Sequence, residues 1–259
     1  MCYNKVMHNP RKTLVMGIVN VTPDSFSDGG RFFRPEEAIR RARNLAAEGA
    51  DLLDLGAEST RPGATPISAE EEWSRLEPVL DGLVGKTAAR LSVDTYHPET
   101  ARLALAAGAD VINCVYPDPV PAMLELLEEC PQAELVLPAQ ARERCPEALR
   151  ARCWFDPMIG FGTTREEDLE LLRTLPELAK QGRVLVGVSR KRIVRKLMLG
   201  DAPTAAAKHL ANQAGKLLGA NLALAVWAAM NGADCLRVHD VAETVQALNV
   251  LRALADNAG

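Results

Sequence analysis

Ionisable and amide side chains recur where the apolar segments of this sequence end. "GIVN" ends at Asn20, "LSVD" at Asp94 and "CWFD" at Asp156. Other apolar segments are followed at corresponding places by Glu58, Thr60, Arg61, Asn113, Lys191, Arg237 and His239. Solvation of strand ends explains any one of these residues, but it explains the combination of carboxylates, amides, arginines, lysine and histidine poorly.

The cationic part of this set suits an anion of the phosphate type. Arg61 and Arg237 each present a planar fork of donors, and His239 adds a ring nitrogen. Asn20 offers a neutral oxygen to a Mg²⁺ ion that keeps most of its waters.

The remaining residues suit a flat heterocycle with amino, imino and keto groups. They are Asp94, Asn113, Asp156 and Lys191. An acidic side chain pairs with an N–C–N edge through two hydrogen bonds, and the amide and ammonium groups supply further donors. The sequence therefore predicts a pocket for a heterocycle that carries a phosphate ester.

The elements that must position these residues alternate regularly along the chain. Strands are expected at 13–19, 51–56, 90–94, 109–115, 133–138, 153–157, 183–188 and 233–238. Helices are expected at 35–49, 68–83, 98–108, 119–130, 165–182 and 241–256, with helical sequence of uncertain breakage over 190–231 and at most a short helix in 139–152. Ser68 and Glu71 have the spacing of a capping box.

Eight strand–helix units predict an α/β fold with a parallel sheet closed into a TIM (β/α)8 barrel, in one domain over 1–259. An open doubly wound sheet is the alternative. The first strand is not followed by GxGxxG, which weakens a dinucleotide-binding fold. The chemistry of a TIM barrel lies at the C-terminal ends of its strands, where the polar residues fall.

Composition and net charge limit the kinds of partner that the chain is expected to bind. The chain has 259 residues, 47% of them hydrophobic and 4% aromatic, and a net charge of −4. That charge disfavours binding to a nucleic-acid backbone, and no apolar segment is long enough to span a membrane. Six scattered cysteines and an N-terminus without the apolar core of a signal peptide indicate free thiols and a cytoplasmic protein.

Several motifs, in order, resemble the dihydropteroate synthase family of pterin-binding TIM barrels. They are "GIVNVTPDSFSDGG", "DLLDLGAESTRPGA", "LSVDT", "AGADVIN", "GFG", "VGVSRK" and "LRVHDV". The resemblance implies a transferase in folate biosynthesis. It would join 4-aminobenzoate to (7,8-dihydropterin-6-yl)methyl diphosphate, giving 7,8-dihydropteroate and diphosphate.

The resemblance also implies the roles of the residues. The pterin would be held by Asp94, Asn113, Asp156 and Lys191. The diphosphate would be held by Asn20, Arg61, Arg237 and His239, with Mg²⁺ on Asn20. The 4-aminobenzoate would be bordered by Phe26, Thr60, Pro62 and Lys191. Asp94, Lys191, Arg237 and His239 would be catalytic, the segment after Asn20 would form a mobile loop over the site, and the chain would form a homodimer.

The sequence also departs from the family's pattern. The segment after the fifth strand is shortened, so that one layer of the barrel is missing or remodelled, and it begins with Pro138. The family has glycine at Met158, lysine at Thr163 and serine at Arg192. Two alternatives therefore stay open: a pterin-dependent transferase with a different second substrate, and a non-catalytic pterin-binding paralogue.

Overall fold

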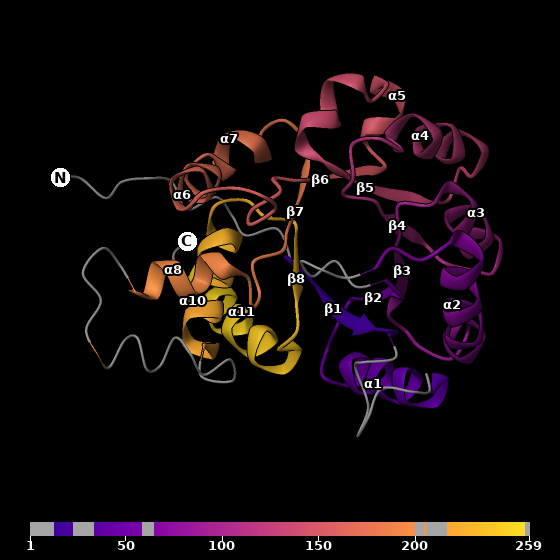
Figure 1. The fold of residues 1–259 in the computed structure, drawn as a ribbon. Helices are drawn as coiled ribbons and strands as arrows, with labels where there is room; N and C mark the ends of the chain where they lie inside the picture. The colour runs from indigo at the N-terminus through magenta and orange to yellow at the C-terminus, as the bar shows by residue number, and fades with distance from the viewer. Residues whose placement is uncertain (1–12, 23–33, 59–64, 200–204, 206–216, 257–259) are drawn as a thin grey trace.

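A closed ring of eight parallel strands forms the centre of the computed structural model (Figure 1). The structure describes residues 13–22, 34–58, 65–199, 205 and 217–256. The strands are β1 (Leu14–Asn20), β2 (Leu52–Gly56), β3 (Arg90–Asp94), β4 (Val111–Asn113), β5 (Glu134–Pro138), β6 (Cys153–Asp156), β7 (Arg183–Val186) and β8 (Cys235–Val238). Each strand pairs with its neighbours in chain order, and β8 pairs with β1. The predicted TIM barrel is therefore confirmed.

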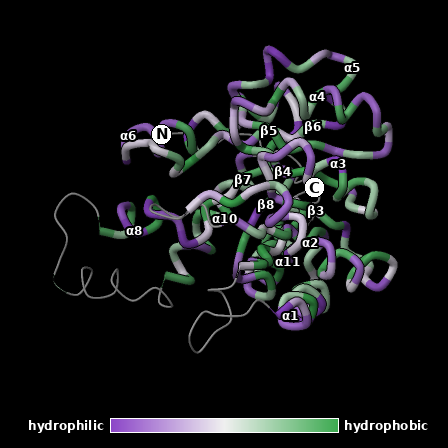
Figure 2. The backbone as a smooth tube through the Cα atoms, turned by 45° about the vertical axis from the view of Figure 1, so that its right-hand side comes forward, coloured by the Kyte–Doolittle hydropathy of each residue, from purple (hydrophilic) through white to green (hydrophobic). Residues whose placement is uncertain are grey.

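Helices surround the ring. They are α1 (Pro35–Ala47), α2 (Ala69–Leu83), α3 (Pro98–Ala106), α4 (Val120–Glu129), α5 (Glu147–Arg150), α6 (Arg165–Arg173), α7 (Leu175–Ala179), α8 (Arg192–Leu199), α10 (Leu218–Met230) and α11 (Val241–Asp256). In the backbone tube, hydrophilic and hydrophobic residues alternate along these helices (Figure 2). This is the pattern of helices that bury one face and expose the other. Each helix in the described part of the chain is too short or too polar to span a bilayer.

The prediction of one continuous helix over 165–182 is wrong. The segment is divided at Thr174 into α6 and α7, with Pro176 in the first turn of α7, where a missing backbone N–H needs no helical partner. The predicted capping box of α2 is half formed. Ser68 Oγ accepts from the Glu71 N–H at 3.2 Å, but the Glu71 carboxylate pairs with Arg75.

The shortened segment after β5 leaves the barrel intact. β5 pairs with both β4 and β6, with Pro138 in register with Asp156. A 3-10 helix, η2 (Ala139–Arg144), and the short α5 replace a full helix. An open groove of about 330 Å³ between η2 and α7, lined in part by Gln140, Pro157 and Leu178, remains on the outside. The part of the barrel formed by β5 and the segment after it is therefore remodelled and not missing.

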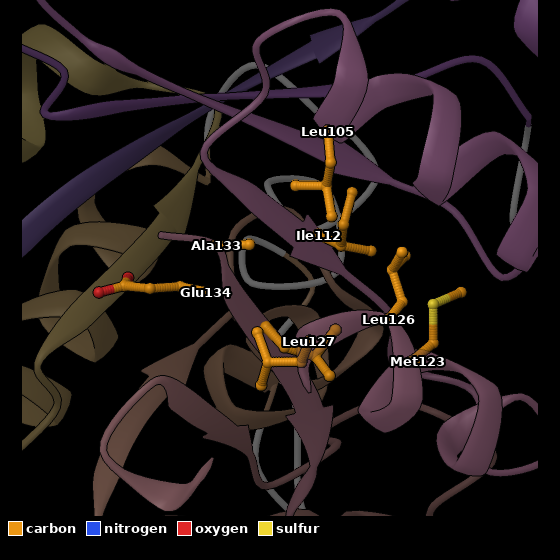
Figure 3. A pocket seen from close by; sticks show the side chains of 8 residues that line it. Leu105, Ile112, Met123, Leu126, Leu127, Ala133 and Glu134 are labelled. Atoms are coloured by element: carbon orange, nitrogen blue, oxygen red, sulfur yellow. The ribbon is translucent and has the colours of Figure 1, made fainter. Parts of the chain in front are cut away.

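The core has two parts. The larger part lies between strands and helices, and a small gap of about 10 Å³ remains there beside Leu105, Ile112 and Met123 (Figure 3). That gap lies outside the barrel wall among aliphatic side chains, so it is a packing defect. The smaller part fills the barrel interior; its buried members are Met16, Leu52, Val111, Val115, Val136, Trp154, Leu185 and Cys235. Because side chains alternate along a strand, every second residue of each strand joins this interior.

An ion cluster closes the N-terminal end of the barrel. The Glu134 carboxylate accepts hydrogen bonds from Arg90 at 3.0 Å, Arg183 at 2.7 Å and the Trp154 indole at 2.7 Å. The Arg183 guanidinium also lies 3.6 Å from the centre of the Trp154 ring. These contacts come from four strands, so they join the barrel at the end away from the predicted site.

Candidate functional site

Polar side chains from adjacent strands lie side by side at the C-terminal end of the barrel. In the strand register, Asn20 pairs with Gly56, Gly56 with Asp94, and Asp94 with Asn113. Asn20, Gly56 and Asn113 each lie two or four residues from a member of the interior cluster on their own strand, and therefore face inward. Asp94 lies between Gly56 and Asn113 in the register, so it faces the same way. The parallel arrangement thus brings together three of the predicted residues from β1, β3 and β4.

One layer deeper in the barrel, Asp54 in the middle of β2 is the centre of a network of hydrogen bonds. It is fully buried, and its carboxylate accepts from Ser92 Oγ at 2.6 Å, Asn113 Nδ2 at 3.1 Å and Arg237 Nε at 2.6 Å. Arg237 Nη2 also donates to Asp94 at 2.6 Å. The predicted residues Asp94, Asn113 and Arg237 are therefore joined through a carboxylate that sequence reasoning missed.

A signal for Asp54 was present in the sequence. It is a lone acid between Leu53 and Leu55, on the same face of the strand as Leu52. A charged residue in such a strand is rarely fully buried unless it is paired. Asp54 and its partner Ser92 lie inside their strands, and a pattern of polar residues at strand ends does not include them.

The network keeps acceptor capacity for a ligand. Asn113 is buried, and its Oδ1 has no hydrogen-bond partner among the described residues. Burial raises the pKa of Asp94 to about 7; Arg237 opposes this shift and the nearby Asp54 carboxylate adds to it. A buried acceptor without a partner costs free energy, so a ligand N–H group at Asn113 would be stabilising.

Asp156 is held at the end of β6 by an unusual backbone. Its Oδ1 accepts from the Met158 N–H at 2.6 Å, and Met158 has a φ of 65°. A left-handed non-glycine residue costs about 1–2 kcal/mol. Met158, which stands where the family's pattern has glycine, therefore adopts a glycine-like conformation at a cost in strain. Burial raises the pKa of Asp156.

Lys191 extends toward the same region from the start of α8. Its Nζ donates to the Ile159 carbonyl oxygen at 2.8 Å and lies 4.2 Å from the centre of the Phe161 ring. Burial lowers its pKa to about 8, and the charge of Asp156 is the main opposing effect. A Cβ at Gly187 would lie 3.7 Å from Lys191 Nζ and from Arg237 Cβ, which places both cations beside β7.

His239 follows β8 and is neutral near pH 7. Burial, Arg190 and Arg237 lower its pKa to about 4. Ser189 Oγ accepts from the His239 backbone N–H at 3.2 Å and lies 3.1 Å from Nδ1. The Ser189 hydroxyl has one proton to donate, and in the tautomer in which it donates to Nδ1, the Nε2 atom of His239 is an N–H donor.

Four predicted residues lie outside the described residues: Phe26, Thr60, Arg61 and Pro62. Asn20 is described and exposed at the end of β1. Within the described part of the chain, no group of three or more His, Cys, Asp or Glu is placed to hold a metal ion. The exposed amide of Asn20 fits a Mg²⁺ ion that takes its other ligands from water and from phosphate oxygens.

The fold and this polar network define the class of protein. The family model described as "Pterin binding enzyme" matches residues 16–150 and 140–239, which is most of the chain. The chain is 36% identical to dihydropteroate synthase of Escherichia coli K12, over 92% of this chain and 90% of that protein. It therefore belongs to the dihydropteroate synthase family of pterin-binding enzymes.

Comparison with solved structures indicates the same family. The chain superposes on Xanthomonas albilineans dihydropteroate synthase with 4-aminobenzoic acid at a TM-score of 0.79, with 40% identity and 93% of each chain covered. The complex of the Xanthomonas albilineans enzyme with 7,8-dihydropteroate gives a TM-score of 0.76 and 38% identity, over 95% of this chain and 94% of that one.

Proposed function

We propose that this chain condenses (7,8-dihydropterin-6-yl)methyl diphosphate with 4-aminobenzoate, releasing diphosphate and 7,8-dihydropteroate. One observation carries the proposal: Asn113 and Arg237 both donate to buried Asp54, Arg237 also donates to Asp94, and the Asn113 Oδ1 acceptor has no partner among the described residues. The relatives' bound ligands support it, since the 40%-identical structure contains 4-aminobenzoic acid and a second contains 7,8-dihydropteroate.

In this proposal the pterin binds against the buried network at the C-terminal end of the barrel. Asp94 accepts from its N–C–N edge, and Asn113 offers both an acceptor and a donor. Asp156 and Lys191 hold the opposite side, where the ammonium remains mostly protonated at pH 7 because its pKa is about 8. This arrangement matches the alternating donors and acceptors of a pterin ring.

The diphosphate binds at the mouth. Arg237 has two of its N–H groups on Asp54 and Asp94, and the others remain for the anion. His239 contributes a neutral Nε2–H donor, and Asn20 and Arg61 complete the set. Asn20 would hold a Mg²⁺ ion, whose positive charge would stabilise the negative charge of the leaving diphosphate.

The reaction begins with cleavage of the C–O bond to diphosphate, and the bonding electrons leave with the diphosphate. The carboxylates of Asp94 and Asp156 stabilise the positive charge that develops on the exocyclic carbon and the ring. The nitrogen of 4-aminobenzoate, bordered by Phe26, Thr60, Pro62 and Lys191, then forms the C–N bond and loses its proton to solvent. The electrophile is strong enough that no strong general base is required.

The deciding experiment measures diphosphate release with and without 4-aminobenzoate. Release that depends on the arylamine is expected, and Asp94→Ala and Lys191→Ala should abolish it. Lys180→Ala is the matched control, because Lys180 is an exposed lysine at the C-cap of α7 that pairs with Glu177. Retained turnover in both site variants would remove the site assignment.

The release assay and calorimetry together separate the two alternative functions. Calorimetry that shows pterin diphosphate binding without arylamine-dependent release would indicate the non-catalytic paralogue. Release with a different arylamine only would indicate the other transferase.

We also propose a cytoplasmic homodimer that uses α10 and α11. Four exposed apolar residues lie on these helices: Trp227, Met230, Val250 and Leu254. The described cysteines are all free thiols, which suits a reducing compartment. Light scattering should give the mass of a dimer for the wild type and of a monomer for a Trp227→Ser, Leu254→Ser double variant. A monomeric wild type would refute the assembly.

A further inference from the structure

One peptide group lies between two charged side chains beside the candidate site. On one side, Lys191 Nζ donates to the Ile159 carbonyl oxygen at 2.8 Å. On the other side, the Gly160 N–H donates to Asp168 Oδ1 at 2.7 Å. These two atoms belong to the same peptide bond, and in a trans peptide the N–H and C=O point in opposite directions. Asp168 and Lys191 therefore hold one rigid plane from its two edges.

Asp168 is built to hold this peptide. It lies on α6 with 1% of its surface exposed. The Thr163 hydroxyl donates to the same Oδ1 atom and accepts from the Gly160 N–H at 3.0 Å. Thr163 is one of the departures from the family's pattern, so in this chain the departure contributes to the hydrogen bonds around Asp168.

The position of Lys191 depends on the same peptide. Gly160 has a φ of 81°, and a Cβ there would lie 3.1 Å from Lys191 Cδ. The lysine stem thus packs against the backbone that Asp168 fixes. Because a hydrogen bond from a peptide N–H to a carboxylate polarises the peptide, the Ile159 carbonyl becomes a stronger acceptor for the ammonium.

We propose that Asp168 is a positioning residue for Lys191, acting through the Ile159–Gly160 peptide to hold the ammonium beside Asp156. This inference rests on the proposed function, in which Lys191 holds the pterin. The charged groups that act on Lys191 are Asp156, Arg237, Asp168 and Asp94. Asp168 is the only one of these four that reaches it through a peptide of the 157–164 segment.

The test compares Asp168→Ala, Asp168→Asn and the control Glu170→Gln, which neutralises an exposed acid on the same helix. Asp168→Ala removes the anchor, and kcat/KM for the pterin diphosphate should fall about 10- to 100-fold, as expected for misplacement of a binding group. Asp168→Asn keeps an oxygen for Gly160 and Thr163, and should recover most of that loss at pH 7. Glu170→Gln should match the wild type.

The pH profile separates a positioning role from a merely structural one. Removing a negative charge lowers the pKa of an ammonium group, so in Asp168→Asn the alkaline loss of kcat/KM should begin at lower pH than in the wild type. The calorimetric affinity for the pterin diphosphate should be highest in the wild type and Glu170→Gln, slightly lower in Asp168→Asn and lowest in Asp168→Ala. A third variant, Thr163→Val, leaves the carboxylate in place and serves if Asp168→Ala fails to fold; it should give an intermediate loss.

The inference fails if Asp168→Asn keeps the wild-type alkaline limb and neither Asp168→Ala nor Thr163→Val weakens pterin binding. In that case Lys191→Ala would still abolish turnover, and the proposed function would stand. Absence of 4-aminobenzoate-dependent diphosphate release by the wild type would instead refute the proposed function itself.

Discussion

Replacing Asp54 by leucine tests whether the buried network holds the site together. Leucine has nearly the shape of aspartate and suits the aliphatic neighbours of the interior cluster. The substitution removes the acceptor of three hydrogen bonds, from Ser92 Oγ, Asn113 Nδ2 and Arg237 Nε. Only Arg237 keeps a second carboxylate, through its 2.6 Å contact with Asp94.

The magnitude follows from these contacts. Each buried donor left without an acceptor costs about 1–3 kcal/mol. Breaking a buried ion pair by removing one partner costs about 3–5 kcal/mol. Because Asp94 still balances Arg237, we expect a loss near the lower end, about 3 kcal/mol, or roughly 6–12 °C in Tm for a chain of this size.

A second variant separates charge from hydrogen bonding. In Asp54→Asn the side-chain oxygen can still accept from Arg237 and Asn113, while the new amide donates to Ser92 Oγ. The hydrogen-bond count is retained and only the charge is lost, so we expect about half the cost of the leucine variant, roughly 1–2 kcal/mol.

Thermal and urea unfolding of both variants provide the measurement, with Asp81→Leu on the exposed face of α2 as the control. A surface change of that kind should stay within about 0.5 kcal/mol. Wild-type stability in Asp54→Leu would refute the reasoning, because it would mean that the network contributes no net stability. Equal losses of stability in the two Asp54 variants would show that the charge of Asp54, and not the number of its hydrogen bonds, determines its contribution to stability.

Three further predictions follow from single contacts. His239 has a pKa lowered to about 4, so the ratio of diphosphate affinities between the wild type and His239→Gln should stay constant from about pH 5.5 to 7.5; an inflection near the ordinary histidine value of about 6.5 would contradict a neutral imidazole. A Cβ at Gly219, the second residue of α10, meets no atom of the described residues within 4 Å, so Gly219→Ala should stabilise the fold by about 0.4–1 kcal/mol in urea unfolding. A Cβ at Gly82 would overlap Ile39 Cδ1, so Gly82→Ala should not stabilise the fold. Glu134→Gln weakens the cluster at the far end of the barrel, and should lower stability by about 1–2 kcal/mol while kcat stays at the wild-type value.

The sequence predicted the fold well because the barrel depends on local patterns. Short apolar segments alternating with amphipathic ones correspond to β1–β8 and their helices within a few residues. The exception is the helix over 165–182, where apolar periodicity runs across Pro176 and conceals the break at Thr174. Periodicity does not report such a break, and a proline alone does not determine it, since α2 continues through Pro78.

The site was predictable only in part. Residues at strand ends, such as Asp94 and Asn113, could be found because the fold itself brings strand ends together. Asp54 lies two residues before the end of β2, and its role depends on a 2.6 Å contact with Arg237, 183 residues away. A contact of that kind follows from the closure of the barrel and not from any local spacing. The Asp168–Lys191 link was hidden for a similar reason, since a backbone peptide joins the two residues.

The barrel explains why these polar groups are effective where they lie. Along the inward face of β2, Leu52 is followed by Asp54, and on β8 Cys235 is followed by Arg237. The polar layer therefore rests directly on an apolar one, which is closed below by the Glu134 cluster. Water is excluded from beneath the network, so the attraction between its charges is screened less than at the protein surface. The same low polarity makes an unpartnered group such as Asn113 Oδ1 costly, and this cost favours a ligand that supplies the missing donor.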